Sequence, residues 1–322
     1  MRLSLNIYAL AHAAGIYNPD GTTPYFQHAE DFLPLVRQTG FSSLELPLDY
    51  FFDDLSDDKF QDFITAATNA GIHIFPALEH YNPDYLCSNL AAMAAQGWTT
   101  IRIKMPHLGD TFYGGNRHLS DHFSTSLASF KTSLDGIESD LADAGVKIAI
   151  ENHQDLDAYD LLDLCETAAH GMRRITWDIG NSLSTLHTPD QFIRIASQYI
   201  ANIHFKDYQV VNMPEGIALR RTILGEGFIP LNHTAEQITA LPQCENISME
   251  LAAHPDRICR ICDQAYYHPQ TMTPDDKKTF DQFVQSVMTE NKAPLSLHGE
   301  SLTKLEIEQT LTSCNVLKSL FI

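Results

Sequence analysis

Four short segments decide how this chain folds: 150-IENH-153, 177-WDIGN-181, 204-HFKD-207 and 249-MEL-251. Each segment lies at the end of a short apolar run, which is the pattern of a strand buried on both faces. Strands of this kind predict a parallel sheet, and the segments place acidic and imidazole side chains at its carboxyl edge.

Eight such runs alternate with longer stretches of helical periodicity. The predicted strands cover residues 3–9, 43–47, 72–76, 99–105, 146–151, 174–178, 201–206 and 246–251. Residues 29–39 and 119–144 carry apolar side chains at helical spacing. Eight βα units predict an α/β protein with a closed (β/α)8 barrel. An open doubly wound sheet is the alternative, and the lack of a GxGxxG motif after the first strand weakens it.

The end of the chain predicts one helix beyond the barrel. Residues 273–292 have the pattern of the last barrel helix, so the catalytic barrel domain is expected to span 1–292. Residues 293–322 are expected to form a C-terminal helical extension, with leucines at rough helical spacing between Ser301 and Phe321. This extension would pack on its own barrel or against another subunit, and a homo-oligomer is compatible with the sequence.

Four side chains from neighbouring strand ends predict a metal site: Glu151, Asp178, His204 and Glu250. The carboxyl ends of barrel strands meet in one shared mouth. Carboxylates buried there repel one another unless a cation binds them. Oxygen ligands with a single nitrogen favour Mn²⁺ or Mg²⁺, with Co²⁺ as a further choice, over a metal that prefers thiolates.

The composition fits a soluble enzyme of the cytoplasm. The chain has 322 residues, of which 44% are hydrophobic and 19% charged, and its formal net charge is −20. So acidic a surface repels nucleic acid and anionic lipid, which excludes both as expected partners. The apolar start of the chain mimics a secretion signal, but Asn6 and His12 interrupt it. No run of about 18 apolar residues is present, so no membrane span is expected.

The six cysteines show no disulfide framework, which fits a reducing compartment. Cys259 and Cys262 form a lone CxxC motif that could bind zinc together with His254 or His268. Because a zinc site normally needs a second pair of ligands, a structural role in a loop or short helix is favoured.

Taken together, the four segments resemble the sugar phosphate isomerase/epimerase superfamily. Its members are xylose-isomerase-like TIM barrels and include ketose 3-epimerases and endonuclease IV. A fifth matching segment is 224-LGEG-227, and the resemblance covers roughly residues 1–290. It implies one Mn²⁺ or Mg²⁺ held by Glu151, Asp178, His204 and Glu250, and a small polyol or keto-sugar substrate. Endonuclease IV is the poorer match, because it needs a three-zinc cluster with more histidines.

The resemblance to ketose epimerases also implies the catalytic roles. Glu151 and Glu250 would stand on opposite sides of the reacting carbon of a 2-keto sugar. One would remove a proton to give an enediolate, and the other would return a proton. Return to the opposite face gives an epimer, whereas return to the next carbon gives an isomer. Asp178 and His204 would act only as metal ligands.

Three positions depart from the ketose 3-epimerase pattern. Asn181, Asp157 and Val210 stand where that group carries a histidine, a glutamate and an arginine. The four implied metal ligands are thus retained, and the three differences predict that other residues surround the substrate. A long loop at 208–224 could bring Arg220 or Arg221 to the site. The candidates for substrate binding are His80, Lys104, His153, Asn181, Lys206 and Arg220.

Three classes of function remain open. The first is a metal-dependent isomerase or epimerase acting on a keto sugar or a sugar acid. The second is a lyase, either a decarboxylase of a 3-oxo sugar acid or a dehydratase, which the basic trio Lys104, Lys206 and Arg220 would favour. The third is a non-catalytic sugar-binding barrel. It ranks last because both carboxylates expected to carry protons, those of Glu151 and Glu250, are present.

Overall fold

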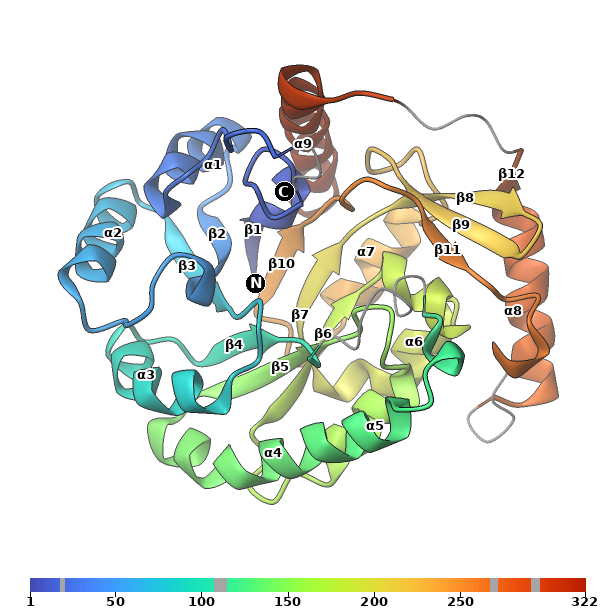
Figure 1. The fold of residues 1–322 in the computed structure, drawn as a ribbon, viewed down its shortest axis with the longest axis horizontal. Helices are drawn as coiled ribbons and strands as arrows, with labels where there is room; N and C mark the ends of the chain where they lie inside the picture. The colour runs from blue at the N-terminus through green and yellow to red at the C-terminus, as the bar shows by residue number, and fades with distance from the viewer. Residues whose placement is uncertain (18–20, 107–114, 267–271, 291–295) are drawn as a thin grey trace.

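The computed structural model describes residues 1–17, 21–106, 115–266, 272–290 and 296–322. Its centre is a closed barrel of eight parallel strands (Figure 1). The barrel strands are β1 (Arg2–Asn6), β2 (Ser43–Pro47), β3 (His73–Ala77), β4 (Thr100–Ile103), β5 (Lys147–Glu151), β6 (Arg173–Asp178), β7 (Ile200–Phe205) and β10 (Asn246–Met249). The predicted barrel and all eight predicted strands are confirmed. Strand β1 ends earlier than expected, because the side chain of Asn6 accepts a hydrogen bond from the backbone N–H of Tyr8 and starts a 3-10 helix over Ile7–Leu10.

Side chains alternate along each strand between the helix layer and the barrel interior. In β7, Ile203 and Phe205 belong to the hydrophobic core, whereas Asn202 and His204 take part in a buried polar network inside the barrel. This network begins below the mouth, where Asn246 donates to Asn202 at 3.0 Å. The interior of this barrel is therefore hydrogen-bonded rather than apolar, and the alternation carries polar side chains up to the mouth.

Seven helices in the described part of the chain connect the strands: α1 (Leu33–Thr39), α2 (Asp58–Asn69), α3 (Pro83–Ala95), α4 (Phe123–Ala144), α5 (Ala158–Glu166), α6 (Pro189–Ala196) and α7 (Leu231–Thr239). The side chains of Asp57, Asn82 and Thr188 accept backbone N–H groups at the starts of α2, α3 and α6. Gly40 and Gly145 end α1 and α4 with φ values of 75° and 69°, where glycine costs least.

A second, four-stranded sheet stands beside the barrel mouth (Figure 1). It contains β11 (Arg257–Cys259), β9 (Gly216–Arg221), β8 (Tyr208–Met213) and β12 (Met288–Thr289), in that order. The expected loop at 208–224 was therefore wrong, because most of it is the β8–β9 hairpin. Val210 and Val211 of β8 and Ile217 and Leu219 of β9 are buried, and this burial stabilises the hairpin.

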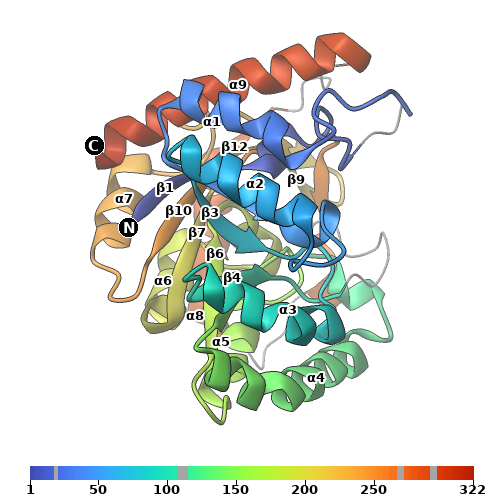
Figure 2. The same ribbon diagram turned by 90° about the vertical axis from the view of Figure 1, so that its left-hand side faces the viewer.

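Helix α9 (Gly299–Phe321) lies beside α1 and α7 and against β10 (Figure 2). Its buried Glu306 accepts hydrogen bonds from the backbone N–H groups of His12 at 3.1 Å and Ala13 at 2.9 Å. The predicted C-terminal helix is confirmed, and it packs on its own barrel in the gap between the first and seventh helices. The boundary expected at 292/293 lies outside the described residues, and the division into two domains stays a prediction.

Helix α8 (Pro274–Val287) forms where the last barrel helix was expected, but its expected place in the ring was wrong. Strand β12, directly after it, pairs with β8 of the accessory sheet. Asp276 at its start contacts Arg194 of α6 at 2.8 Å, and Phe283 meets Phe228 edge to face. Periodicity predicts that a helix forms here, but not which neighbour it packs against.

Within the described residues, no helix is both long and apolar enough to cross a membrane.

Candidate metal and substrate site

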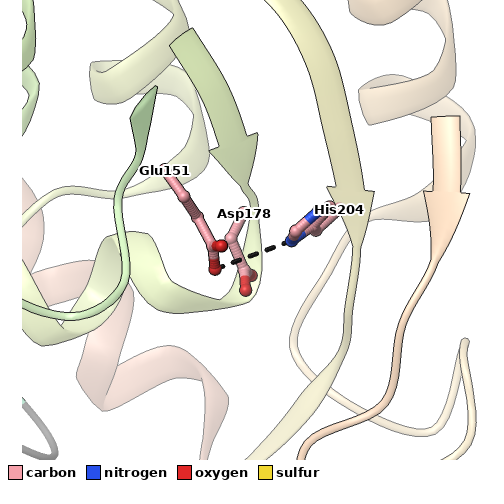
Figure 3. Close-up of side chains that lie close together, drawn as sticks. All are labelled: Glu151, Asp178 and His204. Carbon is pink, nitrogen blue, oxygen red and sulfur yellow. Dashed lines mark ion pairs between the residues drawn. The ribbon is translucent and has the colours of Figure 1, made fainter. Parts of the chain in front are cut away.

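Glu151, Asp178 and His204 converge at the carboxyl ends of three adjacent strands (Figure 3). Glu151 ends β5 and Asp178 ends β6. His204 lies on β7, directly opposite Asp178 in the strand register. One ligand atom from each of the three side chains lies within 4.8 Å of the others, and all three side chains are buried. The fold therefore brings three of the four predicted ligands close enough together to bind one ion.

The imidazole of His204 is held with one nitrogen facing this cluster. Its Nε2 lies 2.8 Å from Oε1 of Glu45, which lies on β2 across the barrel. Its Nδ1 is buried and has no hydrogen-bond partner in the described structure, although carboxylate oxygens of Glu250 and Glu151 lie 2.9 and 3.6 Å away. When an ion is bound, a neutral imidazole that donates Nε2–H to Glu45 would direct the lone pair of Nδ1 toward a cation shared with these oxygens, as a metal-binding histidine does.

Glu250 reaches the same place from just beyond β10. Its Oε2 accepts a hydrogen bond from Asn6 at 2.8 Å and lies 2.9 Å from Nδ1 of His204. Its Oε1 forms an ion pair with Lys206. The predicted fourth ligand is thus adjacent to the other three, although an ammonium group holds one of its oxygens.

Lys206 bridges two of the predicted ligands. Its Nζ lies 2.6 Å from Oδ2 of Asp178 and also contacts Glu250, and only 5% of its side chain is exposed. Burial alone would lower the pKa of Lys206, but Asp178 and Glu250 raise it well above its ordinary value. The lysine is therefore a permanent cation in the site.

Arg102 is a second permanent cation, placed deeper in the barrel. Its Nε lies 3.3 Å from Oε1 of Glu45 and 3.5 Å from Oε2 of Glu151. Burial raises the pKa of Glu45 and of Glu151, yet His204 and Arg102 lower both below the ordinary glutamate value. Arg102 was not among the predicted site residues. It lies two positions before Lys104, so the alternation of side chains along β4 would have placed both on the inner face of the barrel.

The charges of these buried groups match one divalent cation. Four carboxylates surround the site, from Glu45, Glu151, Asp178 and Glu250, and the permanent cations are Arg102 and Lys206. With His204 neutral and all four carboxylates ionised, as ligation of an ion requires, two negative charges remain, and a divalent ion balances them. Without an ion, burial raises the pKa of Asp178 to about 7. Burial would lower the pKa of His204, but Glu45, Glu250 and Glu151 raise it well above its ordinary value, so protons take up the charge that a divalent ion would balance. The donor set therefore fits a divalent metal.

A cavity of about 110 Å³ opens next to this cluster. Its lining residues are Tyr8, Ala11, Ile16, Tyr17, Glu79, Lys104, His153, Gln154, Asn181, Lys206, Tyr208, Glu250, Ala252, Ala253 and Arg257. These residues come from the ends of the barrel strands and from the accessory sheet. The lining combines polar and apolar side chains and touches the metal cluster through Glu250 and Lys206, so this cavity is the candidate substrate site.

Four of the six predicted substrate-binding residues line this cavity: Lys104, His153, Asn181 and Lys206. Asn181 also holds a metal-site carboxylate, because its Nδ2 donates to Oδ2 of Asp178 at 2.7 Å. Lys104 is engaged by Glu79 at 2.5 Å. For these four residues, a role in substrate binding stays a prediction.

The other two predicted substrate residues lie elsewhere. The side chain of His80 is 77% exposed and lies 3.4 Å from Asp49. Arg220 forms an ion pair with Asp256 on the accessory sheet. Neither residue lines the cavity, whereas Glu79 and Arg257 do. Arg221 is also directed away, since it donates to the backbone carbonyls of Ala9 and Ala252.

Two further residues were missed on the cavity wall. Gln154 has a φ of 68°, which is uncommon for a residue with a side chain, and its Nε2 donates to Oδ1 of Asn181 at 3.0 Å. The hydroxyl of Tyr208 donates to the same oxygen at 3.1 Å. No local sequence signal marks a left-handed glutamine, because the conformation is imposed by its surroundings.

Two other features singled out in the sequence, Asp157 and the CxxC motif, do not line the cavity. Asp157 caps the start of α5 and pairs with Arg117 at 2.8 Å, away from the cavity. Cys259 is buried at the end of β11 and Cys262 is exposed, whereas His268 lies outside the described residues. All six cysteines are free of disulfides.

A family model described as xylose isomerase-like TIM barrel matches residues 33–272. The chain belongs to this family. The uncharacterized protein YihM of Escherichia coli (strain K12) is 26% identical to this family member over 88 residues, which is 27% of each of the two chains. That match spans about a quarter of the relative, so it says nothing of activity.

Solved structures of the same fold agree with the family. A D-psicose 3-epimerase from Clostridium cellulolyticum H10, solved with D-tagatose, is 13% identical, with a TM-score of 0.57 over 89% of this chain and 99% of that chain. A xylose isomerase-like barrel protein of Mycobacterium smegmatis in complex with magnesium is 15% identical, with a TM-score of 0.61 over 89% and 97%. A 3-keto-D-glucoside 4-epimerase from E. coli is 11% identical, with a TM-score of 0.56 over 88% and 99%. At these identities the similarity establishes the fold.

Proposed function

We propose that this protein is a divalent-metal-dependent isomerase or epimerase of a keto sugar or sugar-acid derivative. The observation that carries the proposal is the buried cluster of Glu151, Asp178 and His204, in which Nδ1 of His204 faces carboxylate oxygens of Glu151 and Glu250. The proposed ligands are these three residues and Glu250. Two similar structures are named as epimerases of D-psicose and of a 3-keto-D-glucoside, and a third holds magnesium.

Mn²⁺ and Mg²⁺ are the proposed ions, because three carboxylates and one imidazole form a hard, oxygen-rich site; Co²⁺ also accepts this set. When bound, the ion would polarise a substrate carbonyl and acidify the neighbouring C–H group. The six cysteines form no disulfide, which supports a reducing compartment, and we extend the proposal to the cytoplasm.

Glu151 and Glu250 are the proposed proton carriers. They come from separate strands and approach the same imidazole nitrogen, at 3.6 and 2.9 Å. Burial raises the pKa of Glu250, but Lys206 and His204 lower it to about 2, so this carboxylate is ionised at neutral pH. Lys206 would hold the carboxylates in place and supply positive charge close to the developing oxyanion.

The lyase alternative loses part of its support. It depended on a basic trio that would attract an acidic substrate, but Arg220 is bound to Asp256 outside the cavity. Lys104 is neutralised by Glu79, and Lys206 by Asp178 and Glu250. The predicted trio therefore brings no uncompensated charge to the cavity, which favours an isomerase or epimerase of a keto sugar; Arg257 is the other lysine or arginine side chain of the lining.

The test is solvent exchange. Protein stripped with EDTA and reloaded with Mn²⁺ or Mg²⁺ is incubated in D₂O with D-fructose, D-tagatose and D-psicose, and deuterium in the sugar is followed by NMR. We expect metal-dependent exchange next to the carbonyl and formation of an isomer, without loss of CO₂ or water. The variants Glu151→Gln and Glu250→Gln should each lose at least about 100-fold in rate.

Glu166→Gln is the matched control, because Glu166 is an exposed glutamate at the end of α5. It should exchange at the wild-type rate. Near-normal turnover by either shuttle variant with metal present would overturn the assigned roles. Release of CO₂ or water from a substrate would favour the lyase.

A further inference from the structure

Two buried polar atoms in the cavity wall lack a hydrogen-bond partner among the described residues. They are the hydroxyl oxygen of Tyr8 and Oε2 of Glu79. A buried donor or acceptor without a partner is costly, so native proteins rarely keep one without a reason. Both atoms belong to residues that line the candidate substrate cavity, which points to groups of a ligand as their partners.

Glu79 is held so that only one oxygen remains available. Its backbone N–H donates to Oδ1 of Asp49 at 2.7 Å, and Oδ2 of Asp49 accepts the next backbone N–H, that of His80, at 2.8 Å. This pair of bonds fixes the turn after β3. Lys104 then donates to Oε1 of Glu79 at 2.5 Å, and the Glu79 side chain is 13% exposed. Oε2 is therefore the oxygen left for a hydroxyl donor.

Tyr8 connects this end of the cavity to the metal end. Its ring lies under the charges of Lys104, with Nζ at 5.7 Å, and of Arg102, with Cζ at 5.6 Å. Its backbone N–H donates to Asn6, whose side-chain amide donates to Glu250. The phenol is thus fixed between the Glu79–Lys104 pair and a proposed proton carrier, and its hydroxyl can both donate and accept.

We propose that Tyr8 and Glu79 are specificity-determining residues that bind hydroxyl groups at the uncharged end of the substrate. This inference rests on the proposed function and narrows its substrate to a neutral, polyhydroxylated keto compound. The remaining oxygen of Glu79 accepts hydrogen bonds from hydroxyls, but an ionised carboxylate has no proton to donate to a carboxylate or phosphate oxygen. Lys104 and Glu79 neutralise each other, so this pair supplies no net positive charge to hold an anionic group.

The experiment compares neutral and anionic ketoses. D-fructose, D-tagatose and D-psicose are set against fructose 6-phosphate and tagaturonate, with Mg²⁺-loaded protein. Binding is followed by ligand-observed NMR and turnover by deuterium exchange. We expect the wild type to prefer the neutral ketoses. Glu79→Gln should raise KM about 10–100-fold and Tyr8→Phe about 3–10-fold, with kcat changed less and Mg²⁺ affinity unchanged. Glu166→Gln again serves as the control.

The outcomes separate the two proposals. This inference is overturned if metal-dependent exchange occurs but the protein prefers the anionic ketoses. It is also overturned if exchange occurs and KM is unchanged in both Glu79→Gln and Tyr8→Phe. In either case the proposed function is still supported. Neutral ketoses that bind without exchange, and that bind more weakly to both variants, support the recognition site and overturn the proposed reaction. If no neutral ketose binds, the inference is overturned as well.

Discussion

Oε1 of Glu45 lies 2.8 Å from Nε2 of His204, and both side chains are fully buried. Glu45 is held in turn by Ser248, by Asn202 at 3.3 Å and by Arg102 at 3.3 Å. When His204 is neutral, this carboxylate therefore favours the tautomer that carries the proton on Nε2 and directs Nδ1 toward Glu151 and Glu250. A residue that holds the other ring nitrogen of a metal-binding histidine in this way raises the affinity of the site for the ion.

Glu45→Gln should weaken Mn²⁺ binding about 10–100-fold, because the amide no longer stabilises the required tautomer. Calorimetric titration of EDTA-treated protein measures this directly, without any need for substrate. The exposed Glu236→Gln on α7 is the control and should bind Mn²⁺ like the wild type. Unchanged affinity in a folded Glu45→Gln protein would show that Glu45 has no part in orienting the imidazole.

Lys206→Met should make the protein depend on metal for stability. Removing the ammonium leaves Asp178 and Glu250 buried without it, which costs about 3–5 kcal/mol when no ion is present. Added Mn²⁺ should therefore raise the Tm of this variant more than that of the wild type. Lys131→Met, which breaks a more exposed pair with Asp163, should cost less than about 1 kcal/mol. Equal Tm shifts with Mn²⁺ in wild type and Lys206→Met would contradict this account of the site.

Glu306→Ala should destabilise the whole barrel by about 2–5 kcal/mol, as measured by urea unfolding. The substitution leaves two buried backbone N–H groups, those of His12 and Ala13, without their acceptor. It also removes the carboxylate 3.9 Å from the buried Arg221. Glu308→Ala on the exposed face of the same helix should change the free energy of unfolding by less than about 0.5 kcal/mol. Similar losses in the two variants would mean that Glu306 contributes only through helix propensity.

Acid should destabilise the protein partly through His254. Burial, and then the charge of Arg221, lower the pKa of His254 to about 4, and its Nε2 has no partner in the described structure. Because the folded state binds the proton less readily than the unfolded state, stability is full above the unfolded pKa near 6.5 and falls as the pH drops toward 4. Since the side chain is partly exposed, the expected loss between about pH 7.5 and pH 5 is about 1–2 kcal/mol.

The measurement is urea unfolding at both pH values. His254→Asn should show a smaller pH-dependent loss than the wild type. His233→Asn, at an exposed pair with Asp190, is the control and should keep the wild-type dependence. A wild-type slope in His254→Asn would assign the acid sensitivity to other groups.

The strands and three metal-type residues could be predicted because their signals are local. A buried parallel strand needs a short apolar run, and a barrel places every strand end at the same mouth. Glu151, Asp178 and His204 occupy those ends on adjacent strands, so their convergence follows from chain order once the barrel closes. Because side chains alternate between the inside and the outside of the barrel, the position of Lys104 also predicts that Arg102, two residues earlier, points inward.

The partners of each charged side chain could not be predicted in the same way. Lys206 reaches Asp178 on the neighbouring strand β6 and Glu250 beyond β10, on the opposite side of β7. Whether such a lysine binds substrate or neutralises carboxylates depends on distances that chain order does not contain. The same limit applies to Arg220, which the β8–β9 hairpin turns toward Asp256.

Residue types and periods of two and 3.6 are sufficient to predict the eightfold alternation of strand and helix, the polar side chains at the strand ends and an acidic cluster that needs a cation. The position of Glu79 in the cavity, rather than His80, depends on three-dimensional contacts, because two hydrogen bonds to Asp49 set the turn after β3. Such contacts also place α9 rather than α8 where the ring closes, since helical periodicity fixes a buried face but not the surface that covers it.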